Sequence, residues 1–475
     1  MKVLYVASEG APYSASGGLG DVIGALPKAV AKADENVECS VILPLYGNMK
    51  PQHRSELVHV LDITFKLSWR TTGASIYKTR ANNVDYYFVE NHYYFDRAKT
   101  YGEWDDGERF AFFSMAVVEF MQKYELIPDV LHANDWQTAL TVIYLKTKYK
   151  SDKKLANIRT LFTIHNIEFQ GKYDLAILGD VFALDNKYRD IVEQAGCINL
   201  LKGALTVSDF VSTVSPNYAA ELRHDFFAFG LAKIISSVSD KMTGIINGID
   251  YSAFSPSEGS DIYKSFNKRT VKSGKRANKL MLQEELGLEV SEDIPLITMV
   301  TRLTDQKGLD LVLFIIKELL AQRVQVALLG TGDEKYEEAF EAISNEYGNF
   351  KALIKFDRAL SKKLYASADI FLMPSKSEPC GLAQMIACAY GTIPVVRAVG
   401  GLYDSIKPYG TENSNGFTFN NYNAHELLFT VKDALKLYSD KEEWAKLVKR
   451  AINTDFSWDK SADKYLELYN SLKNW

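Results

Sequence analysis

Short apolar segments rich in β-branched residues alternate with helical patterns along almost the whole chain, and the alternation occurs twice. Strands that alternate with helices of about 10–15 residues form parallel sheets with helices on both faces. Two such series predict an α/β protein with two doubly wound domains facing each other across a cleft, where ligands lie beyond the carboxyl ends of the strands. The expected strands are 2–7, 39–43, 130–133, 160–164 and 211–214, then 294–300, 324–329, 352–354, 370–373 and 393–396.

The domain boundary is predicted at Asn247-Gly248-Ile249-Asp250, a turn signal that is followed by loop composition. We therefore expect a first domain over 1–246, a linker over 247–260 and a second domain over 261–455. The segment 460–472 carries apolar residues at helical spacing and is predicted to form an amphipathic helix.

Residues 57–90 depart from the strand–helix alternation. Two segments there, 58–65 and 85–90, are rich in the hydroxyl and aromatic residues that favour strands. We expect them to be paired strands inserted in the first domain.

Charge and cysteine content exclude several classes of protein. The chain has 475 residues, with 55 Lys and Arg against 60 Asp and Glu, and a net charge of −5, which argues against nucleic acid as a partner. The longest apolar runs are well short of the roughly 20 residues that a membrane span needs. The start of the chain has no signal-peptide pattern, so a cytoplasmic enzyme is expected. Four separated cysteines without a CxxC pair are typical of reduced thiols rather than a zinc site: Cys39, Cys197, Cys380 and Cys388.

Two glycine-rich segments stand before predicted helices, one in each half. Ser16-Gly17-Gly18-Leu19-Gly20-Asp21 follows the first strand, and Arg397-Ala398-Val399-Gly400-Gly401-Leu402 follows a strand of the second series. Glycines at a helix start let backbone amides approach an anion. The spacing does not match the dinucleotide-binding fingerprint. Two unrelated flexible turns are the alternative.

Polar residues follow several predicted strands, at the edge where sites of α/β proteins collect. Asp135 follows one strand of the first half, and His165 and Asn166 follow the next. A histidine satisfied within the core is the alternative for His165. The sequence has no HExxH and no histidine pair at metal-ligand spacing, so metal-dependent chemistry is not expected.

The second half carries two cations and an acid in comparable positions. Arg302 and Lys307 are five residues apart, in a predicted strand–loop–helix turn where they can bind a diphosphate. Glu378 stands before a proline after another strand, where its carboxylate can accept from sugar hydroxyls. Solvated surface charges are the alternative in each case.

These segments together resemble the bacterial glycogen synthase and plant starch synthase family, in order from end to end. The two most specific stretches are Thr301-Arg302-Leu303-Thr304-Asp305-Gln306-Lys307-Gly308 and Glu378-Pro379-Cys380-Gly381-Leu382. The other matching segments are Ser8-Glu9, Gly17 to Val22, His132 to Leu140, His165-Asn166, Gln170-Gly171, Ser215-Pro216, Asn247 to Asp250, Gly391-Thr392, Arg397, Gly400 to Leu402 and Phe456-Ser457-Trp458.

The resemblance implies a GT-B type fold of two Rossmann-like domains, an acceptor-side one and a nucleotide-sugar-binding one. It implies that a C-terminal helix within 456–475 crosses back to the first domain. It also implies a retaining glucosyltransferase that needs no metal and no cofactor. Glucose would pass from ADP-glucose to the non-reducing end of an α-1,4-glucan. We expect attack on the same face of the sugar, because no carboxylate pair indicates double displacement.

Site roles follow from the resemblance by matching position. Catalysis is assigned to His165, Glu378, Arg302, Lys307 and Asp135, with the two cations holding the diphosphate and His165 contacting the sugar. Asp21, Asp135 and Asn166 would bind the acceptor. The donor would contact Gly17, Gly18, Arg302, Lys307, Phe356, Glu378, Cys380, Gly381, Leu382, Gly400, Gly401 and Leu402, with Phe356 stacking on the base.

Several positions depart from the family pattern around this site. Ala15 stands where relatives carry a lysine that contacts the donor phosphate, and Val399 where they carry a threonine. Lys376 and Ser377 replace an arginine and an aromatic residue, and Phe254 replaces a tryptophan. Three hypotheses therefore stand: an active glucan synthase with altered donor handling, a non-catalytic glucan-binding or regulatory homologue, or a glucosyltransferase for UDP-glucose or another acceptor. The sequence does not indicate an oligomeric state.

Overall fold

The computed structural model describes residues 1–473, and the chain divides into two compact units. Unit 1 comprises Met1–Asn247 together with the chain from Trp458 onward, and unit 2 comprises Gly248–Ser457. The division falls within the Asn247-Gly248 turn, so residues 248–260 belong to unit 2. There the amide of Ile249 donates to the carbonyl of Phe456 at 2.8 Å.

Unit 1 is built on a sheet that has nine strands within the described residues, in the order β12-β11-β7-β6-β1-β2-β5-β4-β3. From β12 to β5 neighbouring strands pair in parallel. The central strands are buried on both faces, which explains their continuous apolar sequences. The strands are β1 (Lys2–Val6), β2 (Glu38–Pro44), β3 (Val58–Leu67), β4 (Arg70–Ala81), β5 (Val84–Glu90), β6 (Val130–Asn134), β7 (Arg159–Ile164), β11 (Phe210–Thr213) and β12 (Met242–Gly244).

The prediction that 58–65 and 85–90 pair with each other is wrong. An unpredicted strand, β4, lies between them and pairs antiparallel with both β3 and β5. On its other side, β5 pairs in parallel with β2. The sequence of β4 places hydroxyl and charged residues on both faces, so it lacks the apolar alternation by which a strand is found.

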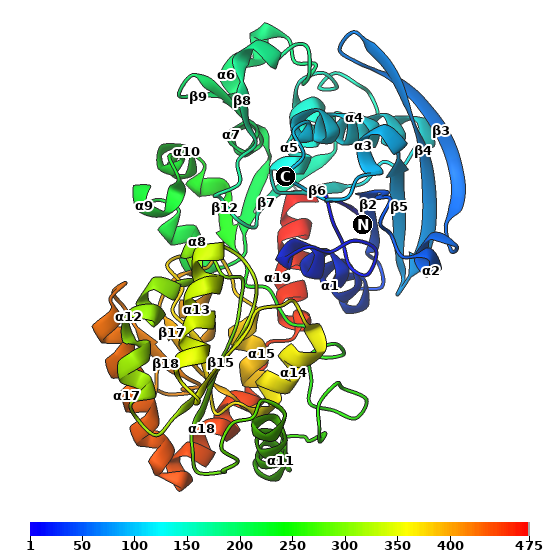
Figure 1. Cartoon of the computed structure of the whole chain (residues 1–475). Helices are drawn as coiled ribbons and strands as arrows, with labels where there is room; N and C mark the ends of the chain where they lie inside the picture. Colours follow the sequence, from blue (N-terminus) through cyan, green and yellow to red (C-terminus); the bar gives the residue numbers. More distant parts are fainter. Residues whose placement is uncertain (474–475) are drawn as a thin grey trace. The chain divides into compact units, whose positions relative to one another are not determined.

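The C-terminal helix α19 (Trp458–Lys473) belongs to unit 1 and packs against α1 (Gly18–Ala33), as Figure 1 shows with α19 in red and α1 in dark blue. Its apolar face completes the core around β1. The buried hydroxyl of Tyr469 lies 2.8 Å from Nδ1 of His132 and 3.0 Å from the hydroxyl of Tyr5. His132 therefore has a structural role, at the strand that precedes Asp135.

The remaining elements of unit 1 cover its main sheet and add a small antiparallel sheet in the order β8-β10-β9. That sheet comprises β8 (Lys172–Asp174), β9 (Glu193–Gln194) and β10 (Cys197–Asn199). The helices are α2 (Pro51–Arg54), α3 (His92–Phe95), α4 (Asp106–Tyr124), α5 (Trp136–Lys146), α6 (Arg189–Val192), α7 (Leu200–Val207), α8 (Pro216–Glu221), α9 (Asp225–Ala228) and α10 (Ala232–Ser237), with short 3-10 turns η1 (Leu175–Ile177), η2 (Asn186–Tyr188) and η3 (Ser239–Lys241).

Unit 2 is built on a parallel sheet in the order β15-β14-β13-β16-β17-β18. Numbered from β13, this is the 3-2-1-4-5-6 order of a doubly wound nucleotide-binding fold. The predicted pair of parallel α/β folds is thus confirmed. The strands are β13 (Leu296–Val300), β14 (Gln325–Leu329), β15 (Phe350–Leu353), β16 (Ile370–Met373), β17 (Ile393–Arg397) and β18 (Phe417–Phe419).

Helices follow the strands of unit 2 as the alternation predicts, with further helices before and after the sheet. One core cluster packs α11 and α14 against β13 and β14 through Leu282, Leu296, Leu329 and Leu364. The helices are α11 (Val271–Glu285), the 3-10 turn η4 (Asp305–Lys307), α12 (Leu309–Leu320), α13 (Glu334–Glu346), α14 (Arg358–Ser367), α15 (Ala383–Ala389), α16 (Gly400–Ser405), α17 (Ala424–Ser439) and α18 (Lys441–Asn453).

Candidate functional site

The parallel part of the main sheet in each unit has one point where the strand order reverses, and ligands of doubly wound folds bind beyond the strand ends there. In unit 1 this point lies between β1 and β6, and in unit 2 between β13 and β16. The polar residues singled out from the sequence follow these strands or β7. We call Glu9, Asn134, Asp135, His165 and Asn166 the unit 1 cluster, and Arg302, Lys307, Ser375 and Glu378 the unit 2 cluster.

Asp135 lies at the centre of the unit 1 cluster. Its Oδ1 accepts from the amide of His165 at 2.7 Å, and its carboxyl also accepts from the amide of Asn166. Its backbone has φ 59° and ψ 175°, a region that non-glycine residues adopt only under strain. Burial raises the pKa of Asp135 to about 7, although the two amides act in the opposite direction. Asp135 therefore holds the end of β7 in place with its own backbone strained.

The ring of His165 is held by Asn134. Its Nε2 lies 2.9 Å from Oδ1 of Asn134, whose Nδ2 donates to the carbonyls of Val6 and His132. Burial lowers the pKa of His165 to about 3, so the ring is neutral at physiological pH. A neutral imidazole in this position can orient a substrate hydroxyl but carries no charge.

Glu9 organises the glycine loop of unit 1, a role that the sequence analysis missed. Its carboxylate accepts from the amide of Ser16 at 2.6 Å, the hydroxyl of Ser16 at 2.7 Å and the amide of Gly20 at 3.2 Å. Burial raises its pKa against these hydrogen bonds. The signal that could have found it is an acid placed directly between a strand and a glycine loop. Gly17 and Gly18 are exposed at the N-terminus of α1, where helix amides favour an anion.

The acceptor residues predicted for unit 1 lie close to these groups. Asp21 is half-buried in the first turn of α1, and its charge contributes to raising the pKa of Glu9. The Oδ1 atom of Asn166 accepts from the amide of Glu168 at 3.0 Å, which shapes the loop after β7.

In the unit 2 cluster, an ion pair joins two loops that flank the reversal point. The ammonium of Lys307 lies 2.7 Å from Oε2 of Glu378, and the hydroxyl of Ser375 donates to the same oxygen at 3.0 Å. Gly308 permits this approach: its φ is +70°, and a Cβ there would lie 2.0 Å from the carbonyl oxygen of Pro374. The structure thus brings together Lys307 and Glu378, and adds Ser375 to them.

Arg302 differs from its neighbour Lys307. Its side chain is exposed, and within residues 1–473 no carboxylate lies within ion-pair distance of its guanidinium. A guanidinium presents donors in a planar fork that matches phosphate oxygens. Arg302 is thus a cation available to an anionic ligand at the end of β13.

The glycines of the second loop are required by close packing. A Cβ on Gly400, whose φ is +46°, would lie 1.9 Å from the carbonyl oxygen of Glu378. The amide of Gly401 donates to that carbonyl at 3.1 Å, and the amide of Leu402 donates to the carbonyl of Val399 at 3.0 Å. These amides are engaged within the protein, so the expectation that they bind the donor stays a prediction that requires the loop to rearrange.

The other predicted donor residues have different surroundings. Phe356 is 89% exposed between β15 and α14, and is free to stack on a ligand. Cys380 is buried, Gly381 has φ +72°, and Leu382 precedes α15. Together they form the loop that follows Glu378.

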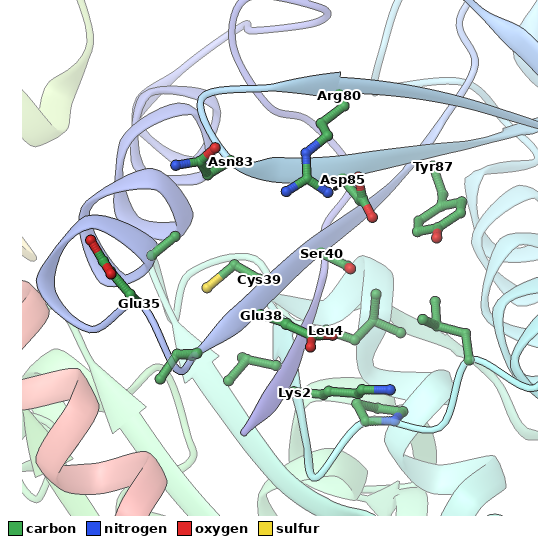
Figure 2. Close-up of a pocket in the computed structure, with 15 residues that line it drawn as sticks. Lys2, Leu4, Glu35, Glu38, Cys39, Ser40, Arg80, Asn83, Asp85 and Tyr87 are labelled. Carbon is green, nitrogen blue, oxygen red and sulfur yellow. Dashed lines mark hydrogen bonds and ion pairs between the residues drawn. The ribbon is translucent and has the colours of Figure 1, made fainter.

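A hollow of about 510 Å³ in unit 1 lies elsewhere (Figure 2). It opens at the amino ends of β1, β2 and β5, where Arg80 and Asp85 form an ion pair at 3.1 Å beside Ser40 and Tyr87. The candidate residues stand at the opposite, carboxyl ends of the strands, so the hollow is not part of either cluster.

Residues 1–473 contain neither a metal-binding cluster nor a membrane-spanning helix. No group of three or more His, Cys, Asp or Glu side chains there is arranged to hold a metal ion. Over the same residues, every helix is too short or too polar to span a lipid bilayer.

Comparison with protein families gives two matches. Residues 2–237 match the family of starch synthase catalytic domains, and residues 286–453 match glycosyl transferases group 1. The first match covers the unit 1 cluster and the second covers the unit 2 cluster.

Among individual proteins, the glycogen synthase of Alkaliphilus metalliredigens is 43% identical over 99% of this chain and 100% of its own. The glycogen synthase of Streptococcus sanguinis is 44% identical with the same coverage. Among solved structures, the catalytic domain of starch synthase IV from Arabidopsis thaliana, bound to ADP and acarbose, matches with a TM-score of 0.91 at 33% identity over 100% of this chain and 99% of that one. Sucrose-phosphate synthase from Thermosynechococcus elongatus has a TM-score of 0.63 at 18% identity over 99% and 98%, which supports the fold alone.

Proposed function

Because the chain belongs to the family of bacterial glycogen synthases and plant starch synthases, we propose that it transfers glucose from ADP-glucose to the non-reducing end of an α-1,4-glucan. The chain is a glycosyltransferase. The observation that carries the assignment of a diphosphate donor is the exposed guanidinium of Arg302, which makes no ion pair within residues 1–473 and follows β13 at the same reversal point as the Lys307–Glu378 ion pair. The similar Arabidopsis enzyme was solved with bound ADP, which supports a glucose donor whose leaving group is ADP.

In this proposal the unit 2 cluster holds the donor. Arg302 and Lys307 bind the diphosphate and stabilise the charge that develops as it leaves. Ser375 and Lys307 both contact Oε2 of Glu378, and within residues 1–473 Oε1 has no hydrogen-bond partner, so Oε1 can accept from glucosyl hydroxyls. Phe356 stacks on the base.

The unit 1 cluster acts on the sugar and the acceptor. His165 contacts the glucosyl group, Asp135 keeps the loop that carries it in place, and Asp21 and Asn166 lie on the acceptor side. Gly17 and Gly18 at the start of α1 contribute amides to the donor.

The transfer itself retains the configuration of the sugar. The bond between C1 of glucose and the diphosphate oxygen breaks, and its electron pair stays on the diphosphate. The acceptor 4-hydroxyl bonds to C1 on the same face, and its proton passes to the departing diphosphate. The protein contributes positioning and charge stabilisation through Arg302 and Lys307, without metal.

The test is glucose transfer to glycogen by the purified protein in the presence of a chelator, with ADP-glucose and UDP-glucose in parallel. Transfer from ADP-glucose that exceeds transfer from UDP-glucose supports the proposal. Equal or preferential use of UDP-glucose would reassign the donor. No transfer from either would overturn the proposal.

A second candidate function is a glucan-binding homologue without catalysis. The observation that favours it is Ala15, exposed in the glycine loop, where the family resemblance implies a phosphate-binding lysine. The intact Lys307–Glu378 pair argues for the active enzyme, as does Arg302, whose guanidinium has no carboxylate partner in the described part of the chain. Glycogen binding without turnover of either donor would establish this second function.

A further inference from the structure

Asn134 is buried in the unit 1 cluster, and the function proposed above gives it no role. It ends β6, the residue is only 1% exposed, and its backbone amide donates to the hydroxyl of Thr138 at 2.7 Å. Its Nδ2 donates to the carbonyls of Val6 at 3.2 Å and His132 at 3.1 Å. Carbonyl oxygens only accept, so these two contacts fix which end of the amide carries the hydrogens.

The orientation of this amide determines the state of the His165 ring. The atom of Asn134 that faces Nε2 of His165, at 2.9 Å, is the oxygen, which can only accept. Nε2 must therefore carry a hydrogen, and in a neutral imidazole Nδ1 is then an acceptor. Within residues 1–473, Nδ1 has no hydrogen-bond partner and is not sealed off from solvent.

We propose that Asn134 is a positioning residue that holds the His165 ring in the Nε2–H tautomer and so presents Nδ1 as an acceptor for a substrate hydroxyl. The proposal deepens the function proposed above and rests on it for the identity of the substrate as a hydroxyl-bearing sugar. Asn134 acts through His165 and does not itself touch the sugar.

The charges around the ring are consistent with a neutral His165. Burial lowers its pKa to about 3. The neighbouring His132 is also neutral, because burial and the proximity of His165 lower its pKa to about 3. Asp135 faces the backbone of His165, and Glu9 lies near Asp135. With the pKa of Asp135 raised to about 7, that carboxyl is largely protonated below neutral pH and draws no second proton onto the ring.

The first test is nitrogen NMR of the full-length protein labelled with ¹⁵N in its histidine rings. The chain has seven histidines, and the His165 signals are those lost in His165→Gln. We expect the neutral Nε2–H pattern throughout the range from about pH 5.5 to about pH 8. An Nδ1–H pattern, or titration within this range, would overturn the proposal. This measurement needs neither activity nor an Asn134 variant.

The second test compares Asn134→Asp with Asn157→Asp, a matched change on the surface. A carboxylate at 134 favours a second proton on the His165 ring, which turns Nδ1 into a donor. We expect the NMR pattern of an imidazolium and a fall in kcat/KM for glucosyl transfer of about 10-fold at neutral pH, recovering as the pH rises. Asn157→Asp should leave both unchanged.

The outcomes separate the two proposals. A folded Asn134→Asp protein with unchanged kcat/KM, pH profile and ring pattern would overturn the role of Asn134. If Asn134→Asp does not fold, the NMR pattern of His165 in the unaltered protein decides whether the proposed tautomer is present. If the unaltered protein transfers no glucose while its His165 shows the Nε2–H pattern, the proposed function fails and the role of Asn134 in setting the tautomer stands.

Discussion

The ammonium of Lys307 lies 2.7 Å from Oε2 of Glu378, and this ion pair joins the loop after β13 to the loop after β16. Lys307 is 14% exposed and Glu378 is 8% exposed. Removing one of two charges buried to this extent destabilises the fold, because the other is then held away from water without a counter-charge. The pair therefore fixes the geometry of the unit 2 cluster before a ligand arrives.

Glu378→Gln should lower both stability and activity. Loss of the carboxylate leaves Lys307 without its counter-charge, and we expect the free energy of unfolding to fall by about 2 kcal/mol. Loss of a charge-assisted contact to the sugar should lower kcat/KM for ADP-glucose by about 10- to 100-fold. Thermal unfolding and initial rates measure the two effects. Glu346→Gln, which breaks an exposed pair with Lys317, is the control and should change neither. Unchanged stability in Glu378→Gln would contradict a structural role for the pair.

Arg302→Gln should separate activity from stability. The guanidinium is exposed and makes no ion pair within the described residues, so its removal should change the free energy of unfolding by less than about 0.5 kcal/mol. Loss of its contacts to the departing diphosphate should reduce kcat about 100-fold or more. The kcat of Arg302→Lys should lie between those of the unaltered protein and Arg302→Gln, because a lysine keeps the positive charge but lacks the planar fork. A variant that is destabilised but active would contradict the assignment.

Ala15→Lys should raise turnover of ADP-glucose. Ala15 is exposed in the glycine loop, so a lysine there can extend without displacing the core. One added charge-assisted contact to phosphate predicts a gain of about 10- to 100-fold in kcat/KM. Ala15→Met, of similar length but uncharged, is the control. Equal rates for the two variants would show that the missing lysine does not limit donor handling.

Asp135 should make unfolding depend on pH. Burial raises its pKa from 3.8 to about 7 in the folded chain. Between these values the folded state holds a proton that the unfolded state has released, so the free energy of unfolding falls as the pH rises from about 4 to about 7. Asp135→Asn keeps an acceptor for the amide of His165 and removes the titration. We expect the stability of the unaltered protein relative to Asp135→Asn to decrease by a few kcal/mol at most over this range.

Chemical unfolding of both proteins at several pH values measures this difference. Asp225→Asn, an exposed aspartate of unit 1, is the control. A difference between the unaltered protein and Asp135→Asn that is constant with pH would contradict the raised pKa of Asp135.

Gly400→Ala should disturb the loop that carries Glu378. A Cβ at Gly400 would lie 1.9 Å from the carbonyl oxygen of Glu378, and its φ of +46° disfavours alanine as well. We expect loss of more than about 1 kcal/mol of stability together with loss of activity. Gly348→Ala, where nothing lies within 4 Å of the added carbon, should be neutral. Thermal unfolding and transfer rates of both variants would reveal the difference, and equal behaviour would contradict the close packing.

The fold was predictable where strands are buried on both faces. The continuous apolar runs of β1, β6 and β7 are visible in the sequence for this reason. The half-buried strand β4 was not, because its polar residues lie on both faces. The strands β8, β9 and β10 have two or three residues each, too few for a pattern to emerge.

The part of the candidate site that was predictable follows from one rule, that ligands of parallel α/β sheets bind at the carboxyl ends of the strands. That rule selects Asp135, His165 and Glu378. It does not reveal that Asn134 contacts His165, because this contact depends on the register of β6 against β7, in which Asn134 lies opposite Thr163. The role of Glu9 depends in the same way on how the loop over 14–20 turns back on the end of β1.

The central claim is that this chain is an active, retaining glucosyltransferase for ADP-glucose in spite of Ala15. Proton NMR of the purified protein with ADP-glucose, a maltooligosaccharide and a chelator tests it most directly, because the anomeric signals report bond formation and configuration together. The account predicts loss of ADP-glucose with matching growth of α-1,4 signals, and both about 100-fold slower or more in Arg302→Gln. Unchanged spectra with ADP-glucose and with UDP-glucose, from a protein that still binds glycogen, would contradict it.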